Sequence, residues 1–293
     1  MTPESDSLQR FVFEHLAVRG ELVHLDATWQ AILERHDYPQ PVRDLLGQMM
    51  AAATLLSATL KFDGAMTLQV QGGGPVTLMV VEVTAERSLR GMAHWEGELV
   101  DGPLESLVGT GRLVITVDPG EGRERYQGIV ELTGESLSEA LDAYLAQSEQ
   151  LDTRLWLAAD GQAAGGLLIQ RLPGEEAEAD QDAWQRISLL SETVRPDELL
   201  GLHAREIIHR LFHEEDVRVF ETEPVCFRCS CSRERVANML RSLGREEVND
   251  ILEEQGAIEV TCEFCNQHYS FDAVDAEQLF TAEHPPEVPK TRH

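Results

Sequence analysis

All five cysteines of this chain lie between residues 226 and 265, and none occurs in the first 225 residues. A secreted fold that is held by disulfides spreads its cysteines through the structure that they cross-link. Cysteines gathered in one short window are instead typical of a metal or redox site in a reducing compartment. The sequence therefore predicts a small metal-binding or redox module in this part of the chain, preceded by a larger domain.

Four of these cysteines form two spaced pairs. Cys229 and Cys231 make a C-x-C motif, and Cys262 and Cys265 make a C-x-x-C motif between two segments that resemble strands. The C-x-x-C spacing lets both of its sulfurs reach one metal from a tight knuckle. The C-x-C thiols, two residues apart, point the same way in extended backbone, so both can meet the same ion. Four soft thiolates complete a tetrahedral site and favour a single zinc ion. We expect all four to be zinc ligands.

Three alternatives stay open at these residues. The same four thiols could bind an iron–sulfur cluster. Cys226, three residues before Cys229, could replace a ligand, act as a resolving thiol, or be a spare thiol beside the site. His268 follows Cys265 by three residues and could ligate the metal, although four thiolates already complete the set.

Acidic residues outnumber basic residues by 52 to 24, which gives the chain a formal net charge of −28. Such a charge repels DNA, RNA and anionic membrane surfaces at long range, and no basic cluster in the sequence opposes it. No apolar run reaches the roughly 18–20 residues of a membrane span, and no positively charged n-region opens the sequence. We expect neither nucleic acid nor membrane as a partner, and the cytoplasm as the location.

Residues 1–172 are predicted to form an α+β domain with a largely antiparallel sheet. Apolar residues at helical spacing predict a helix over 39–61. A second helix is expected to begin at Ser136 or Ser138 and to reach about residue 150. Closely spaced strands, bounded by glycine, proline or aspartate, favour antiparallel pairing. The predicted strands span residues 66–71, 76–83, 89–95, 112–117, 125–132, 154–158 and 167–172.

Residues 173–225 are predicted to form a linker that is acidic first and helical later. Carboxylates crowd residues 175–182, which is typical of a solvated segment. Pro196, followed by two carboxylates, suits the first turn of a helix, and a broad apolar face extends from there to residue 212. A charged, amphipathic segment between two domains depends on docking for its stability.

Residues 226–293 are predicted to form a small zinc-binding domain. Two short helices are expected to end at Gly244 and Gly256, and strands are expected at 258–261 and 269–271. Residues 285–289, rich in proline, read as a disordered tail. A domain with so little apolar surface is marginal alone, and a structural metal supplies the missing folding free energy.

The chemistry of thiolate ligands allows more than a structural role. Zinc on four thiolates carries a net charge of about −2, so the sulfurs stay electron-rich and open to oxidation. The two thiols of a C-x-x-C motif can close a local disulfide, and an oxidised sulfur is a poor ligand. Loss of the metal would then remove most of the folding free energy of the domain. From the residues alone, a structural zinc site and a redox switch both stay open.

The cysteine motifs and several other segments resemble the redox-regulated 33 kDa molecular chaperone (heat shock protein 33) family. The family signature is C-x-C, a spacer near thirty residues and C-x-x-C, and the spacer here, from Ser232 to Thr261, has 30 residues. Similarity extends along the whole chain. The matching segments are residues 124–128, 144–150, 164–166, 211–215 and 227–235.

The resemblance implies an ATP-independent holdase that binds unfolding proteins during oxidative stress and passes them to other chaperones for refolding. It implies zinc on the four matching cysteines in a reduced, inactive state. Oxidation would pair Cys229 with Cys231 and Cys262 with Cys265, release the zinc, unfold the module and loosen the linker. Residues 1–172 are then expected to bind substrate and to dimerise, because active members are typically homodimers. Cys226 departs from the family pattern, which makes a Cys226–Cys229 disulfide an alternative.

Two other classes of function compete with the chaperone. One is a zinc-module adaptor, and the other is a thiol oxidoreductase that carries a structural site of four cysteines. The glycines at 72–74 are not followed by the lysine and hydroxyl residue of a phosphate-binding loop, so we expect a turn there. No set of nucleophile, base and orienting group is readable, and we therefore expect no catalytic residue and no enzyme.

Overall fold

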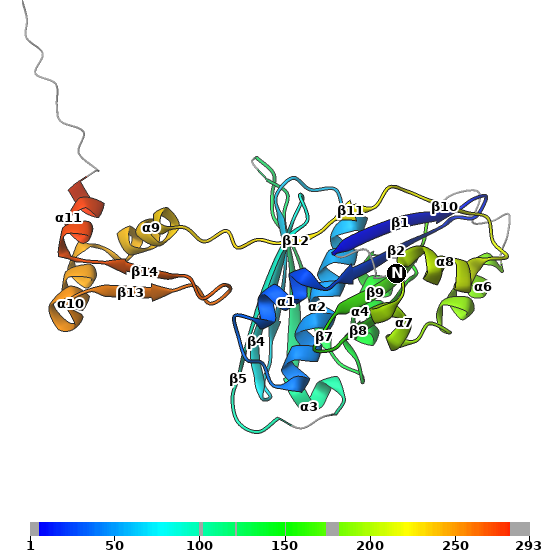
Figure 1. The fold of residues 1–293 in the computed structure, drawn as a ribbon, viewed down its shortest axis with the longest axis horizontal. Coiled ribbons are helices and arrows are strands. Elements are labelled where there is room, and N and C mark those ends of the chain that lie inside the picture. The colour runs from blue at the N-terminus through cyan, green and yellow to red at the C-terminus, as the bar shows by residue number, and fades with distance from the viewer. Residues whose placement is uncertain (1–5, 100–101, 121, 150, 174–181, 282–293) are drawn as a thin grey trace, which may run out of the picture. The chain divides into compact units, whose positions relative to one another are not determined.

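The structure, a computed structural model, describes residues 6–99, 102–120, 122–149, 151–173 and 182–281 (Figure 1). The chain divides into two compact units, Met1–Arg228 and Cys229–His293. Residues 175–181 of the predicted acidic run lie outside the described residues, and so does the predicted tail at 285–289.

Two six-stranded sheets build the first unit. The first sheet contains β1 (Ser7–Phe13), β2 (Val18–Leu25), β8 (Thr153–Ala159), β9 (Ala164–Arg171), β10 (Val217–Val219) and β11 (Glu223–Pro224). Its order is β10-β1-β2-β9-β8, and β11 also pairs with β1. The second sheet contains β3 (Ala65–Gln71), β4 (Val76–Thr84), β5 (Ser88–Trp95), β6 (Gly111–Asp118), β7 (Tyr126–Leu132) and β12 (Cys226–Phe227). Its order is β12-β5-β4-β3-β6-β7, and every pairing except the parallel β12–β5 contact is antiparallel.

Helix α2 (Gln40–Thr59) lies between the two sheets and forms the centre of the core. A proline in its first turn is pre-organised for the helix. Its residues are buried on nearly all sides, as in a helix that is covered on both faces. Three shorter helices and a π-helical turn complete this layer: α1 (Ala27–Leu33), α3 (Leu104–Val108), α4 (Leu137–Tyr144) and η1 (Leu145–Glu149).

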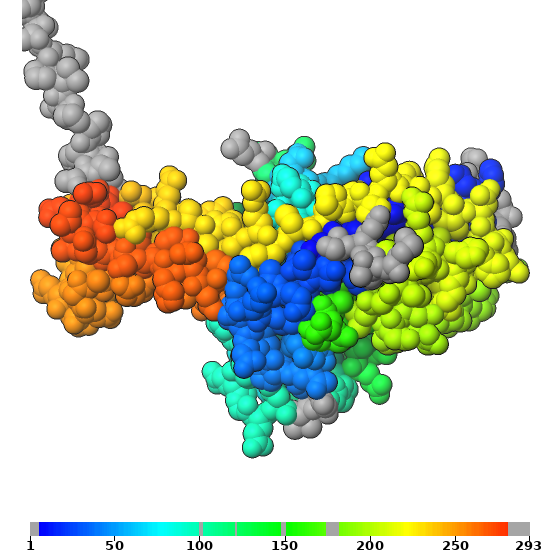
Figure 2. Space-filling view, viewed as in Figure 1, coloured from blue at the N-terminus to red at the C-terminus, as the bar shows by residue number. Residues whose placement is uncertain are grey.

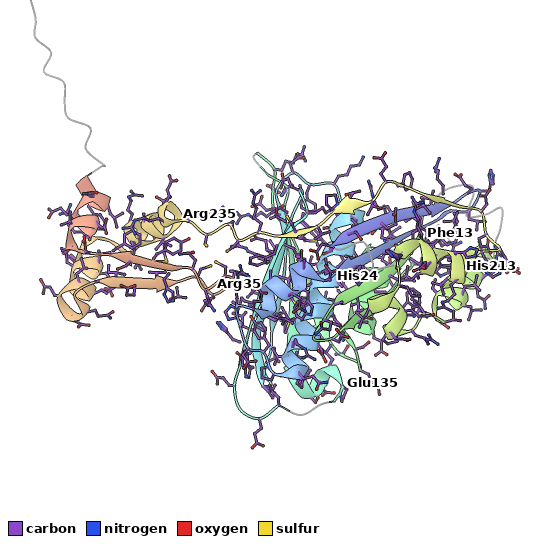
Figure 3. All side chains as sticks on the ribbon, viewed as in Figure 1. Phe13, His24, Arg35, Glu135, His213 and Arg235 are labelled. Carbon is purple, nitrogen blue, oxygen red and sulfur yellow. The ribbon has the colours of Figure 1, made fainter. Side chains whose placement is uncertain are left out.

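Three helices cover the other face of the first sheet: α6 (Ala183–Ser191), α7 (Pro196–Gly201) and α8 (Ala204–Phe212). Phe13 of β1 points into their cluster (Figure 3). The ring of Phe212 lies 4.9 Å from that of Phe13 and 5.9 Å from that of Phe11, measured between centroids. Successive residues of β2 face opposite sides of the sheet: Leu22 faces α8, and Val23 faces α2. The first sheet is therefore buried on both faces.

The predicted fold class is confirmed: α and β elements mix, and the sheets are antiparallel but for one short pairing. The predicted helix over 39–61 and all seven predicted strands are present, with boundaries that differ by one to three residues. The helix capped by Ser136 ends at Tyr144 and continues as the π-helical turn η1. The apolar face predicted between Pro196 and residue 212 is divided between α7 and α8.

A buried carboxylate interrupts the apolar pattern of β2. Glu21 is only 2 % exposed, and its Oε2 has no hydrogen-bond partner among the described residues. Burial raises the pKa of Glu21 to about 7, although the guanidinium groups of Arg19, Arg10 and Arg87 act in the opposite direction. The folded chain therefore keeps a proton at this carboxyl that the unfolded chain loses above its ordinary pKa of 4.5.

Replacing Glu21 with glutamine is expected to stabilise the first unit at pH 8 but hardly at pH 4.5. Because the folded pKa is raised, the contribution of Glu21 to stability falls as the pH rises from about 4.5 to about 7 and stays low above that. The loss amounts to about 2–3 kcal/mol. Denaturant unfolding followed by tryptophan fluorescence measures it, because all four tryptophans lie in the first unit. A variant with the same stability difference at both pH values would contradict this account.

The second unit is small and has its own core. It contains α9 (Arg233–Leu243), α10 (Arg245–Gln255), β13 (Ile258–Thr261), β14 (His268–Phe271) and α11 (Ala273–Thr281). Gly244 and Gly256 end the first two helices at φ values of 93° and 79°, a region that favours glycine. The predicted helix stops and strands are thus confirmed here. Within the described residues of the chain, we find no helix that is both long and apolar enough to span a membrane.

Candidate metal centre

The C-x-C pair lies directly before helix α9. Ser232 is the N-cap of this helix, and its Oγ accepts a hydrogen bond from the backbone N–H of Arg235 at 3.2 Å. Cys231 therefore lies directly before the positive end of the helix dipole. The side chain of Arg235 turns back and donates to Ser230 Oγ at 2.6 Å, which restrains the residue between the two thiols.

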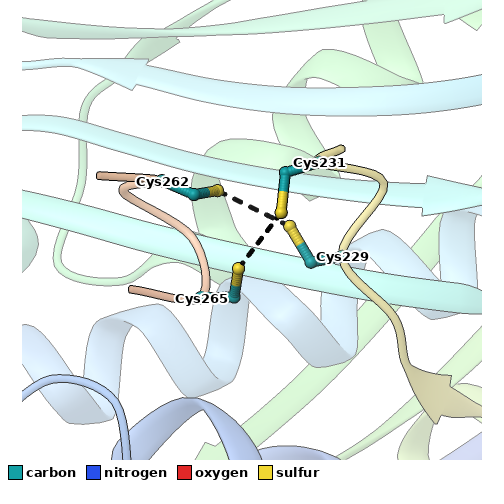
Figure 4. Close-up of side chains that lie close together, drawn as sticks. All are labelled: Cys229, Cys231, Cys262 and Cys265. Carbon is teal, nitrogen blue, oxygen red and sulfur yellow. Dashed lines mark hydrogen bonds between the residues drawn. The ribbon is translucent and has the colours of Figure 1, made fainter. Parts of the chain in front are cut away.

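The C-x-x-C pair forms the turn between β13 and β14. The backbone N–H of Cys262 donates to the carbonyl of Gln267 at 3.0 Å, and that of Asn266 donates to the carbonyl of Cys262 at 2.8 Å. Asn266 takes the left-handed conformation, with φ of 57°, that lets the chain reverse within this knuckle. The turn presents Cys262 and Cys265 on one side, opposite the C-x-C pair (Figure 4).

The four sulfurs converge on one point. Cys229 Sγ lies 3.6 Å from Cys262 Sγ, Cys231 Sγ lies 3.3 Å from Cys265 Sγ, and all four lie within 4.8 Å of one another. A tetrahedral ion with zinc–sulfur bonds of about 2.3 Å places its sulfurs about 3.8 Å apart. The donor set and its spacing therefore fit one metal ion. The four cysteines of a four-iron cluster bind different irons and would be held further apart.

The thiols differ in acidity because their hydrogen bonds differ. Burial acts to raise the pKa of Cys229, but the backbone N–H of Cys231 and the neighbouring thiols outweigh it and lower the pKa to about 7. Burial raises the pKa of Cys262 above its ordinary 9.0 and raises that of Cys265 much further. Without a metal, four thiols this close cannot all ionise. A divalent cation would remove that restriction, which again fits a metal site.

Tyr269, on β14, is a site residue that the sequence did not reveal. Its hydroxyl donates a hydrogen bond to Cys231 Sγ at 3.1 Å. This hydrogen bond raises the pKa of Tyr269 to about 12, so the phenol stays protonated and continues to donate. Tyr269 shares a strand face with the buried Phe271, two residues away, so its alternation in β14 was the signal available in the sequence.

We expect Tyr269→Phe to bind zinc about ten-fold more weakly, because outer-shell hydrogen bonds to ligands typically contribute 10- to 100-fold to metal affinity. Competition between the reduced protein and a chromogenic chelator measures the affinity. Tyr126→Phe, which removes an exposed hydroxyl from β7 in the first unit, is the matched control. Equal affinities in both variants would show that the Tyr269 hydroxyl does not support the site.

The other two candidates from the sequence lie outside this cluster. Cys226 belongs to β12 in the first unit, is exposed, and has its Sγ 3.9 Å from Ser88 Oγ. His268 pairs through Nδ1 with Thr261 Oγ1 at 2.9 Å. Neither belongs to a cluster of described residues that could hold a metal ion, whereas the four predicted ligands are brought together.

Comparison with known proteins decides the family. A family described as "Hsp33 protein" matches residues 6–272. The chain belongs to the Hsp33 family. The 33 kDa chaperonin of Methylobacillus flagellatus is 54% identical over 280 residues, which cover 95% of this chain and 96% of the relative. That of Nitrosococcus oceani is 53% identical over 288 residues, with 98% and 99% covered.

The fold agrees with this assignment. The crystal structure of the 33 kDa chaperonin (heat shock protein 33 homolog) from Thermotoga maritima superposes with a TM-score of 0.81 at 24% identity and covers 95% of this chain and 99% of its own. The resemblance read from the sequence is therefore confirmed. The Hsp33 family is a family of chaperones, and in this Hsp33 member the cluster of four cysteines fits zinc and redox roles.

Proposed function

We propose that this Hsp33 member is a redox-regulated, ATP-independent holdase whose four clustered thiols hold one zinc ion in the inactive state. The observation that carries the proposal is the convergence of Cys229, Cys231, Cys262 and Cys265 within 4.8 Å of one another in a chain of this family. A soft ligand set of four thiolates favours zinc over the harder divalent cations. The protein acts by binding unfolding clients, in a reducing compartment such as the cytoplasm, and not by turnover.

The switch is a four-electron oxidation. Each disulfide forms when two thiolates give up two electrons to one hydrogen peroxide molecule, which takes up two protons and becomes two waters. Two peroxide molecules thus convert four thiolates into two disulfides, which we assign as Cys229–Cys231 and Cys262–Cys265, the pairs within each motif. The disulfide sulfurs are poor ligands, so the zinc leaves.

Release of zinc acts on a unit that has little else to hold it. Its buried apolar residues are Ala237, Leu240, Val248, Ile258, Phe271, Ala276 and Leu279. Because so small a core is marginal, its folding depends on the metal. We propose that unfolding of this unit then loosens residues 173–225, uncovers client-binding surface on the first unit, and leaves the active chain as a homodimer that passes clients to other chaperones.

The test compares reduced, zinc-loaded protein with peroxide-treated protein in suppressing aggregation of a thermally unfolding client. Only the treated protein should suppress it, with release of one zinc and loss of four thiols per chain. Cys226→Ser, which removes the thiol outside the cluster, should respond in the same way. Equal suppression by both forms would refute the switch, and zinc that stays bound until denaturation would make the site purely structural.

A further inference from the structure

The last part of the first unit, residues 216–228, pairs with the edges of both sheets; we call it the strap. Its strands β10 and β11 lie antiparallel on β1, and β12 lies parallel on β5. In Figure 2 its yellow atoms lie beside the dark blue atoms of β1. The strap therefore occupies the edge position of both six-stranded sheets at once.

Backbone groups make most of the contact between the strap and the sheets. Besides the ladder bonds of the strand pairings, strap N–H groups donate to carbonyls in or next to β1 and β5: Phe220 to Arg10 (3.0 Å), Val225 to Asp6 (2.8 Å), Cys226 to Arg87 (3.1 Å) and Arg228 to Leu89 (3.1 Å). One further bond runs the other way, from the N–H of Glu14 to the carbonyl of Asp216 at 2.8 Å. Any extended chain could make bonds of this kind.

The side chains of the strap add ion pairs and half-buried apolar contacts. Glu223 pairs with Arg10 and Arg87, and Arg218 pairs with Glu14, but these pairs lie at the surface, where an ion pair contributes little. Val217, Val219 and Phe227 pack against the cores only in part. Val225 is the one fully buried residue among 216–228, all of which are described. Phe220 is 40 % exposed, and Phe227 is half-buried under the Arg35 guanidinium, 4.5 Å from its ring centroid. Segments with few buried apolar contacts and solvent-exposed backbone bonds open at low free energy. The strap is therefore easily replaced by a competing extended segment.

We infer that the edges of β1 and β5 beneath the strap are docking sites for extended segments of unfolding client proteins. This inference rests on the proposed holdase function and names the surface it uses. Strand addition to a sheet edge draws affinity from backbone hydrogen bonds, which every polypeptide offers. It suits a chaperone that must accept clients of unrelated sequence. The strap is the resident segment that keeps these edges closed.

The position of the strap links its release to the metal centre. Its last residue, Arg228, is followed directly by Cys229, the first of the four clustered cysteines. While the second unit is folded, this end of the strap is held by an ordered neighbour in sequence. Once that unit unfolds, the strap is followed by a flexible chain. This flexible chain raises the conformational entropy of the state in which the strap has left the sheet edges.

A single substitution can lock the strap. Cys226 is the register partner of Ser88 on β5, and Ser88 Oγ lies 3.9 Å from Cys226 Sγ. We therefore use a full-length chain in which the four clustered cysteines are serines and Ser88 is cysteine, so that Ser88→Cys and Cys226 form the one disulfide available. The same chain with Ser88 retained is the matched control.

With the disulfide closed, client holding is expected to fall at least ten-fold, and dithiothreitol should restore it. The control should hold clients equally with and without dithiothreitol. Equal holding by the locked and the reduced chain, with closure verified by thiol counting, would overturn the inference but leave the proposed function standing. A control that holds no client would instead count against the proposed function. If the closed disulfide abolished dimerisation but left client holding unchanged, the edges would bind a second copy of the chain and not a client.

A peptide probe tests backbone recognition without any engineered disulfide. An extended, apolar client peptide is measured against peroxide-treated wild-type protein, together with a version of the same sequence that is N-methylated at every amide. Methylation removes the backbone N–H donors along both edges of the extended peptide and leaves its side chains unchanged. The methylated peptide should bind at least ten-fold more weakly. Equal binding of both peptides would show that side chains alone are recognised and would overturn the inference.

Discussion

Replacing Cys265 with serine is expected to unfold the second unit, to loosen residues 173–225, and to leave helix α2 and strands β1 to β9 of the first unit folded. Cys265 Sγ lies 3.3 Å from Cys231 Sγ, in a cluster of four thiols that could hold one ion, and its loss leaves three thiols. Structural zinc contributes about 10–16 kcal/mol of apparent binding free energy in small metal-dependent folds. The seven buried apolar residues that the described part of this unit contains cannot replace a contribution of that size.

Hydrogen exchange followed by mass spectrometry measures this outcome segment by segment. In reduced Cys265→Ser, amides of residues 229–281 should lose their protection, while those of β3 and β4 in the first unit should keep it. Any change in tryptophan fluorescence should come from Trp184, which lies in α6 of residues 173–225, since the other three tryptophans lie in the part of the first unit that stays folded. Cys226→Ser should keep both its zinc and its protection. A second unit that stays protected without zinc would show that its core suffices, and a switch based on metal loss would then fail.

The grouping of the four thiols could be predicted from the sequence because each pair is set by local spacing. The spacing of Cys229 and Cys231 is set by the C-x-C motif, and that of Cys262 and Cys265 is set by the C-x-x-C turn between two short strands. Tyr269 could not be predicted as a partner of the site, because its hydroxyl meets Cys231 only through the packing of β14 against α9. The sequence predicts the cluster of thiols, and the tertiary structure supplies the groups that surround it.

The strands of the fold likewise divide into those that the sequence pattern predicts and those that depend on tertiary contacts. Strands β3 to β9 were predictable because their apolar residues alternate or run continuously between turn residues. Strands β1 and β2 were not, since Arg10, Arg19 and Glu21 interrupt their pattern for reasons that depend on an ion network across strands. The strap was not predictable either. Strands of two or three half-exposed residues have no periodicity, and only the sheet edges that they cover define them.

Replacing Phe212 with alanine is expected to detach helices α6 to α8 from the first sheet and to activate the chaperone without oxidation. Phe212 is 2 % exposed, and its ring stands at 84° to that of Phe13, with the centroids 4.9 Å apart. Truncation of a buried phenylalanine costs about 3–5 kcal/mol. The truncation destabilises a segment whose stability depends on docking. Detachment of that segment uncovers apolar residues such as Phe11 and Leu167.

Two measurements on the reduced, zinc-bound Phe212→Ala protein check this expectation: binding of a hydrophobic dye and suppression of client aggregation. Both should rise at least several-fold over wild type, and the peroxide dose for full activity should fall. Leu189→Ala removes a leucine from α6 that is 55 % exposed, and it should behave as wild type. A reduced Phe212→Ala protein that exposes apolar surface yet holds no client would show that the sheet face is not the surface that matters. The covered edges of β1 and β5 would then be left to account for client binding.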